Sequence, residues 1–307
     1  MAIPEPQQIL VGIDPVKDFR PALAWAADEA RRRGGALRLV VAVPPAHDTH
    51  HVDDTPRYTA QRLEATQLLR TAVAWAGERE PEIRTGSAVL DGFPAGVLAG
   101  LSDGADMTVL GSRRLGRVEE FLSAGSVVVP VTARAHCPVV VVPAREGVPG
   151  EQEDASVPPL VAGVDGSESS YAALGLAFEE AALRSCALRV VAAWQQPVFS
   201  PHAEASGFPS ELRMLREVTD GWVEEYPEVR LVREVLVGSP VEVLAEAAQH
   251  ASALVVGRRG RGGYAGMRLG SVVRGLLHRA RCPVITVPAR TATGGGATKG
   301  RARIGSG

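Results

Sequence analysis

The chain has 307 residues, 45% of them hydrophobic and only 5% aromatic, with a formal net charge of -2. This balance excludes proteins that attract nucleic acid or anionic membranes through a global basic field, so any anion site must be local. The length predicts two domains, and three scattered cysteines exclude a disulfide framework or a paired-cysteine metal site.

The first residues, MAIPEPQQIL, lack the basic region and apolar core of a signal peptide. No stretch approaches the 18 uninterrupted apolar residues of a membrane-spanning helix. We therefore expect a cytoplasmic protein with no membrane partner and no nucleic-acid partner.

The first half of the chain returns in the second half with its landmarks in the same order. Segment 9–14 (ILVGID) returns at 160–165 (LVAGVD), and segment 124–144 returns at 269–289 with the same Cys-Pro step before an apolar run. Equivalent positions lie 151 residues apart at the start of the units (14 to 165) and 145 near their ends (125 to 270). This self-similarity predicts two tandem copies of one unit.

The domain boundaries follow from the repeat and from composition. We expect an N-terminal domain over 1–146, a linker over 147–158, a C-terminal domain over 159–290 and a tail over 291–307. The linker region is acidic and rich in Pro and Gly. The tail has too little apolar content to pack, so we expect it to be disordered.

Each unit alternates strand and helix patterns, which predicts an α/β fold of two tandem doubly wound domains with parallel strands and helices on both faces. In the second unit we expect strands near 160–165, 187–194, 229–236, 253–257 and 283–288. A helical stripe facing the sheet is predicted from the spacing of Leu212, Leu215, Val218 and Trp222.

Two helix starts in the second unit can be read from the sequence. Ser239, Pro240 and Glu242 form a capping box with Pro at the first helical position, so a helix is expected to begin there. The last helix is expected to begin at Ser271, followed by apolar residues on one face. The final apolar strand of each unit is expected at a sheet edge, where its backbone groups are unpaired.

The stretch 47–54 (HDTHHVDD) combines histidines with aspartates and offers two readings. It could ligate a metal, but no rigid helical spacing positions these side chains, which favours a solvated loop.

The segment 257–271 (GRRGRGGYAGMRLGS) lies between the fourth strand and the last helix of the second unit. Ligands of open α/β sheets bind outside the carboxyl ends of strands, where the strand order reverses. A helix start offers free N–H groups and the positive end of its dipole. We expect the glycines to adopt positive φ and approach phosphate closely, with Arg258, Arg259, Arg261 and Arg268 adding positive charge.

The spacing Gly257-x2-Gly260-x9-Gly270-Ser271 resembles the nucleotide-binding branch of the universal stress protein family. The resemblance covers nearly all of 7–289. It implies five parallel strands in order 3-2-1-4-5 in each domain, with ATP held between the first and fourth strands. It also implies that the final strands pair with each other, making one chain a pseudo-dimer, and a further homodimer is plausible.

The resemblance further implies the residues of the site. Asp165 would lie near the adenine, Ala193 would wall the base, and the glycine loop would hold ribose and phosphates. The implied set is Gly163, Val164, Asp165, Ala193, Val256, Gly257, Arg258, Gly260, Gly270, Ser271 and Val272. Any Mg²⁺ would be held mainly by the phosphates and water, because the loop contributes no carboxylate. Asp165 could also be a helix-capping residue.

The first unit departs from this pattern and is expected to be a degenerate second site. It keeps Asp14, Gly111, Gly125 and Ser126. Arg114 stands where the second glycine should be, and Glu119 and Glu120 enter the loop, which lowers its charge to +1 over 111–126 against +4 over 257–271. Carboxylates repel a triphosphate, so only the second unit is expected to bind nucleotide well.

Catalytic signals are weak throughout the sequence. There is no GxxxxGK[ST] run, no nucleophile elbow, and no pair of carboxylates near the loop. We therefore expect a nucleotide-binding protein that regulates the stress response through protein partners that the sequence does not name. The alternatives are a nucleotide-independent interaction scaffold and a slow ATP hydrolase.

Overall fold

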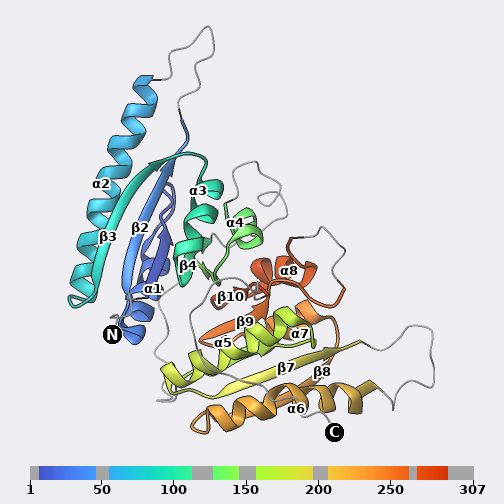
Figure 1. Ribbon diagram of the computed structural model, residues 1–307. Helices are drawn as coiled ribbons and strands as arrows, with labels where there is room; N and C mark the ends of the chain where they lie inside the picture. Colours follow the sequence, from blue (N-terminus) through green and yellow to red (C-terminus); the bar gives the residue numbers. More distant parts are fainter. Residues whose placement is uncertain are drawn as a thin grey trace.

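The computed structural model describes residues 7–45, 55–112, 127–144, 157–195, 207–262 and 268–289 (Figure 1). The tail 291–307, the histidine-rich stretch 47–54 and all but the last two residues of the linker 147–158 lie outside these described residues. Within the described ranges no helix is long and apolar enough to cross a membrane.

The two copies are built from the same alternation of strands and helices. The first copy contains β1 (Gln8–Gly12), α1 (Arg20–Arg33), β2 (Ala36–Val43), α2 (Thr55–Arg79), β3 (Arg84–Asp91), α3 (Pro94–Leu101), the short 3-10 helix η1 (Ser102–Gly104), β4 (Met107–Ser112), α4 (Val128–Arg134) and β5 (Val139–Pro143). The second contains β6 (Leu160–Gly163), α5 (Glu168–Arg184), β7 (Leu188–Trp194), α6 (Gly207–Glu225), β8 (Leu231–Val237), α7 (Pro240–Ala247), β9 (Ala253–Gly257), α8 (Ser271–Arg279) and β10 (Val284–Val287).

All described strands join one sheet in the order β3-β2-β1-β4-β5-β10-β9-β6-β7-β8. Each copy contributes five parallel strands in the order 3-2-1-4-5, as the resemblance implied. The copies meet through antiparallel pairing of β5 with β10, in which Val141 faces Val284 and Val139 faces Thr286. The final strands are therefore inner strands of a continuous sheet, and its remaining edges are β3 and β8.

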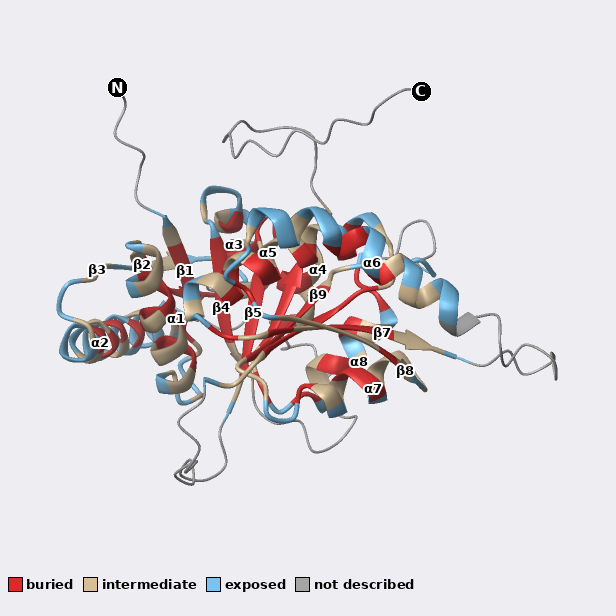
Figure 2. Cartoon of the chain, turned by 90° about the horizontal axis from the view of Figure 1, so that it is seen from below, coloured by how far each residue is buried: buried red, intermediate tan, exposed pale blue. Residues whose placement is uncertain are grey.

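The strands next to the junction are buried on both faces, as expected for a parallel sheet covered by helices. The apolar run of β9, Ala253 to Val256, is 4% exposed or less, and Figure 2 shows buried residues concentrated on the sheet and on the inward sides of the helices. The predicted stripe of α6 is confirmed, with Leu215 and Val218 buried. Gly175 of α5 leaves room for the Trp222 ring, which lies 2.8 Å from where a Cβ would be.

The predicted helix starts at Pro240 and Ser271 are confirmed, but the capping box is wrong. Ser239 is the N-cap residue of α7, yet its side chain makes no capping hydrogen bond. The Glu242 carboxylate instead accepts a hydrogen bond from Arg279 of α8, 3.2 Å away. Glu242 thus binds Arg279 of the neighbouring helix and not the backbone N–H of Ser239 that a capping box would use.

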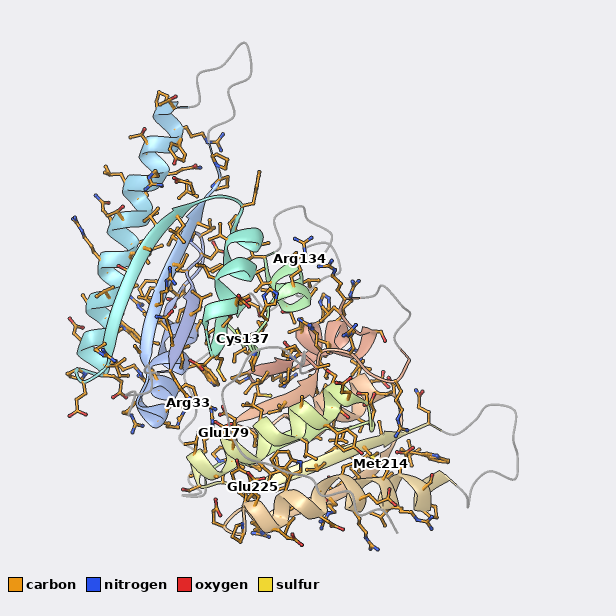
Figure 3. The ribbon with its side chains drawn as sticks, viewed as in Figure 1. Arg33, Arg134, Cys137, Glu179, Met214 and Glu225 are labelled. Carbon is orange, nitrogen blue, oxygen red and sulfur yellow. The ribbon has the colours of Figure 1, made fainter. Side chains whose placement is uncertain are left out.

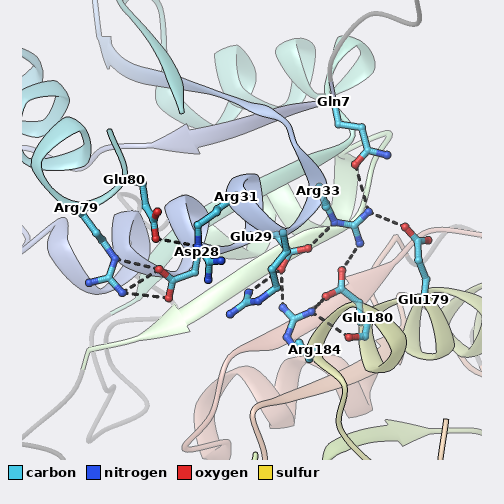
Figure 4. A network of polar contacts seen from close by, with 11 residues as sticks. Gln7, Asp28, Glu29, Arg31, Arg33, Arg79, Glu80, Glu179, Glu180 and Arg184 are labelled. Carbon is cyan, nitrogen blue, oxygen red and sulfur yellow. Dashed lines mark hydrogen bonds and ion pairs between the residues drawn. The ribbon is translucent and has the colours of Figure 1, made fainter. Parts of the chain in front are cut away.

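Two glutamates and two arginines form a closed ring of ion pairs where α1 meets α5 (Figure 4). Arg33 pairs with Glu29 in its own helix and with Glu180 of the other copy, and Arg184 pairs with Glu180 and Glu29 in the same way. Both glutamate side chains are 0% exposed, and the arginines are 8% and 6% exposed. The members are related by the 151-residue offset of the repeat (29 to 180, 33 to 184), so the ring lies on the pseudo-twofold axis.

Neighbouring groups complete the charge balance of this ring. Arg33 also donates to Glu179 at 2.7 Å, and Figure 3 shows these two side chains approaching each other from the two copies. The Arg184 guanidinium lies 5.7 Å from the centre of the Trp25 ring. Burial alone would raise the pKa of Glu29, but Arg184 and Arg33 outweigh it and hold that pKa below its ordinary value. Glu29 is therefore ionised at neutral pH.

Replacing Arg184 by Met should destabilise the folded chain by about 3–5 kcal/mol, because two buried glutamates each lose a partner. The measurement is urea unfolding followed by circular dichroism. The matched control is Arg31→Met, whose partner Glu80 forms an exposed pair with a 57% exposed Arg31 side chain. That control should cost less than about 1 kcal/mol. Equal losses in the two variants would contradict the structural role assigned to the ring.

Candidate functional site

The candidate site lies at the carboxyl ends of two neighbouring strands of the second copy, β6 and β9. Gly163, the last residue of β6, pairs with Val256 of β9. From β6 the chain moves to β7 on one side, while β9 lies on the other side, so the strand order reverses here. Asp165 and Gly257 therefore lie at the same end of two neighbouring strands, as the sequence predicted.

The Asp165 carboxylate connects the end of β6 to the glycine loop. One oxygen accepts a hydrogen bond from the Ser167 backbone N–H at 3.0 Å, and the other accepts one from the Arg261 backbone N–H at 2.9 Å. Burial raises the pKa of Asp165, but hydrogen bonds from Ser167 and Arg261 outweigh this and hold it below its ordinary value. Asp165 thus supplies a fixed negative charge that orders the first half of the loop.

Two serines that the sequence analysis did not select fasten the loop from the same side. Ser167 is the N-cap of α5 and accepts from the Ser170 N–H, while its hydroxyl donates to the Arg259 carbonyl at 3.3 Å. Ser169 donates to the Val287 carbonyl at 3.0 Å and accepts from the Arg259 N–H at 3.3 Å. The helix-capping alternative for Asp165 is wrong, because Ser167 has that role. The polar run DGSESS after β6 was the available signal.

Two glycines of the loop, Gly257 and Gly260, are required by close contacts and not by positive φ. The expected positive φ is wrong for Gly257 and Gly260, since neither has it. A Cβ on Gly257 would lie 2.7 Å from the Ser169 carbonyl carbon, and one on Gly260 would lie 2.5 Å from an Asp165 carboxylate oxygen. The glycine with positive φ is Gly166, at +74°, in the turn that presents Asp165.

The amino end of α8 is open towards the loop. Its N-cap residue is Gly270, which has no capping side chain and whose own N–H donates to the Arg258 carbonyl at 3.0 Å. Ser271, the first helical residue, is exposed. No acceptor among the described residues takes the N–H groups of Ser271, Val272 or Val273. These groups and the helix dipole form a site suited to an anion.

Four arginines precede this helix start in the loop sequence. In the described part of the chain no carboxylate pairs with Arg258, Arg259, Arg261 or Arg268. Burial, together with repulsion from Arg259 and Arg268, lowers the pKa of Arg258. The Arg258 side chain does not face the loop, because its Nη1 donates to the Ala135 carbonyl of the first copy at 2.6 Å.

Several residues implied by the resemblance lie in the core. Gly163, Val164 and Val256 are buried, and Ala193 and Val272 are half-buried. Gly163 has a packing role as well, because a Cβ there would lie 2.8 Å from Leu244 of α7 and collide with it. These residues lie at or next to the carboxyl ends of β6, β7 and β9 and at the start of α8.

The equivalent region of the first copy is arranged differently. One Asp14 oxygen accepts from the Val16 N–H at 3.0 Å, and the other pairs with Lys17 Nζ at 2.9 Å. A lysine therefore occupies the Asp14 oxygen that corresponds to the one bound by a loop amide in the second copy. Gly111 is the second-last residue of β4. Gly125 and Ser126 lie outside the described residues, as do Arg114, Glu119 and Glu120.

The described residues show no metal-ligand cluster, and the two cavities that they border lie away from this site. Among the described residues no group of three His, Cys, Asp or Glu side chains could hold a metal ion. Two cavities lie at the opposite, amino ends of the strands; one borders Arg38 and Arg84, and the other borders Cys186. Neither includes a residue of the glycine loop.

Comparison with known proteins places these features in a family. The profile of the universal stress protein family matches residues 6–143 and 158–288. A universal stress protein of Mycobacterium tuberculosis is 33% identical over 285 residues, covering 90% of this chain and 95% of the relative. Another from that organism is 35% identical over 302 residues, covering 90% and 93%. A universal stress protein structure from Archaeoglobus fulgidus has the same fold, with a TM-score of 0.66, 16% identity, and coverage of 93% and 97%.

Replacing Gly257 by Ala should destabilise the second copy by about 1–3 kcal/mol, because the new methyl group overlaps the Ser169 backbone. The matched control is Gly262→Ala in the same loop, where nothing lies within 4 Å of a Cβ. Urea unfolding of both variants measures the difference. A control as unstable as Gly257→Ala would show that the close contact with Ser169 is not the constraint.

Proposed function

Because the chain belongs to the universal stress protein family, we propose that its C-terminal domain binds one adenine nucleotide, ATP, at the carboxyl ends of β6 and β9. The bound nucleotide would order the glycine loop and so regulate contacts with protein partners in the stress response. The choice of ATP as the ligand rests on the family resemblance and on the chemistry of the loop.

The amino end of α8 carries the proposal. Three consecutive N–H groups, from Ser271 to Val273, lack described acceptors, and the arginines of the loop have no described carboxylate partner. A polyphosphate would supply the acceptor oxygens and the negative charge that this arrangement lacks. Ser271 adds an exposed hydroxyl donor at the first helical position.

The adenine would lie between the turn that follows β6 and the end of β7. Asp165 is ionised and could accept from the exocyclic amino group of the base, in competition with the Arg261 N–H that it now binds. Ala193 near the end of β7 is half-buried and small, which leaves room for a flat ring. Mg²⁺, where it accompanies ATP, would be held by the phosphates and water, because the described part of the loop offers no carboxylate of its own.

We propose one nucleotide per chain because the two copies differ at their acidic residue. Asp165 receives a loop amide, whereas Asp14 is neutralised by Lys17 at 2.9 Å. The turn of the first copy also lacks the serine cap, since the N-cap of α1 is Phe19, which makes no capping hydrogen bond. The first copy then serves as a scaffold for the second. The alternative of a nucleotide-independent scaffold would in this way apply to the first copy alone.

ATP should bind to the purified chain with a stoichiometry close to one, measured by calorimetry after removal of any nucleotide carried through purification. Ser271→Glu should weaken binding by about 10-fold or more, because its carboxylate repels the phosphates. A carboxylate at a helix start stabilises the helix, so weaker binding would not reflect unfolding.

The matched control is Thr55→Glu at the start of α2 in the first copy, which places the same charge at an exposed helix start. It should leave ATP affinity unchanged. A stoichiometry of two, or equal losses in both variants, would contradict the assignment of the site to α8. No binding to the parent chain would leave the scaffold alternative.

We also propose that the site binds ATP without turning it over, because no general base is placed beside the amino end of α8 in the described structure. At saturating ATP, the rate of ADP formation by the parent chain should not exceed the rate measured for the Ser271→Glu variant purified in the same way. A rate in the parent chain that is clearly higher and disappears in the variant would support the hydrolase alternative.

A further inference from the structure

Arg258 makes hydrogen bonds in both copies: its main chain in the second copy and its side chain in the first. Its main chain lies at the base of the glycine loop, where its N–H donates to the Val287 carbonyl at 2.7 Å and its carbonyl accepts from Gly270 at 3.0 Å. These bonds connect the end of β10 to the N-cap of α8. Any ordering of the loop by a ligand therefore acts directly on the Arg258 backbone.

The Arg258 side chain crosses to the first copy. Its Nη1 donates to the carbonyl of Ala135, the C-cap residue of α4, at 2.6 Å. The last carbonyls of a helix have no intrahelical donor and carry the negative end of the dipole, so a cation is favoured there. The buried Nε of Arg258 has no partner among the described residues, so the hydrogen bond to Ala135 is the described contact that holds this half-buried cation.

Apolar contacts join the same two helices. Val129 and Ala133 of α4 pack against the hydrophobic cluster beneath α8, and Leu277 of α8 packs against the cluster beneath α4. Figure 1 shows α4 and α8 facing each other across the junction of the copies. The Arg258 hydrogen bond therefore lies beside a packed contact that can transmit a change in order.

Comparison of equivalent positions in the repeat shows that the hydrogen bond from Arg258 to Ala135 has no counterpart in the opposite direction among the described residues. The residue equivalent to Arg258 is Ser112 at the end of β4 (111 and 257 mark the preceding glycines), and the equivalent of Ala135 is Ala280. No hydrogen bond joins Ser112 to Ala280 in the described structure. At this pair of equivalent positions, the described residues include one arginine, Arg258 of the second copy, and it donates to the C-cap residue of a helix in the other copy.

We infer that Arg258 couples nucleotide binding in the C-terminal copy to the order of α4 in the N-terminal copy. This inference depends on the proposed function, because it describes how the same site is regulated. A bound nucleotide would order the base of the glycine loop and with it the backbone of Arg258. The side chain of Arg258 then caps the carboxyl end of α4. By reciprocity, the contact with α4 raises the affinity for nucleotide.

The test is hydrogen exchange at the amides of Val131 and Ala135, whose N–H groups bond to the carbonyls of Val127 and Val131. The variant is Arg258→Met and its matched control is Arg281→Met, which removes the same charge from an exposed position beyond the carboxyl end of α8, outside the proposed site. Without ligand, exchange should be about 10-fold faster in Arg258→Met than in the control, the effect of one charge-assisted hydrogen bond. Equal rates would overturn the inference.

With ATP, exchange at these amides should slow in the parent chain and in Arg281→Met but not in Arg258→Met. Equal slowing in both variants, or no slowing in a parent chain that calorimetry shows to be saturated, would overturn the coupling. Failure of ATP to bind the parent chain would instead overturn the proposed function. The ligand-free comparison would then still decide whether Arg258 orders α4.

Discussion

The antiparallel pairing of β5 with β10 is the constraint on which the rest of the structure depends. It makes two five-stranded parallel sheets into one, and it covers the backbone edge that each copy would otherwise expose. The same pairing brings α1 against α5, where the buried Glu29–Arg33–Glu180–Arg184 ring closes. It also places α4 beside α8, within reach of Arg258. Each interaction between the copies is a consequence of this one edge.

Small substitutions within this nearly symmetric frame distinguish the two copies. In the second copy an aspartate and two serines after β6 fasten the glycine loop through hydrogen bonds to Arg259 and Arg261. In the first copy Lys17 neutralises the equivalent Asp14. A duplicated fold can thus keep one binding loop while the other copy supplies the surface against which that loop is held. The hydrogen bond from Arg258 of the second copy to Ala135 of the first is consistent with these two separate roles.

Local patterns predicted the strands, because apolar runs such as 253–257 must be buried wherever the sheet forms. The capping box failed since Glu242 binds Arg279, a partner 37 residues away that no local rule includes. Positive φ at Gly257 was wrong for the same reason: Gly257 ends β9, and the close contact that requires a glycine there comes from Ser169 of α5. Interdomain contacts of Arg33 and Arg258 depend on which helices face each other, and the sequence does not specify this.

The central claim is that the amino end of α8 binds the phosphates of a nucleotide. The most direct measurement is an ATP titration followed through the amide chemical shifts of Ser271, Val272 and Val273. The account predicts that these three signals move together and saturate at one equivalent. Unmoved signals, or shifts confined to the surroundings of Asp14 and Gly111 in the first copy, would contradict it.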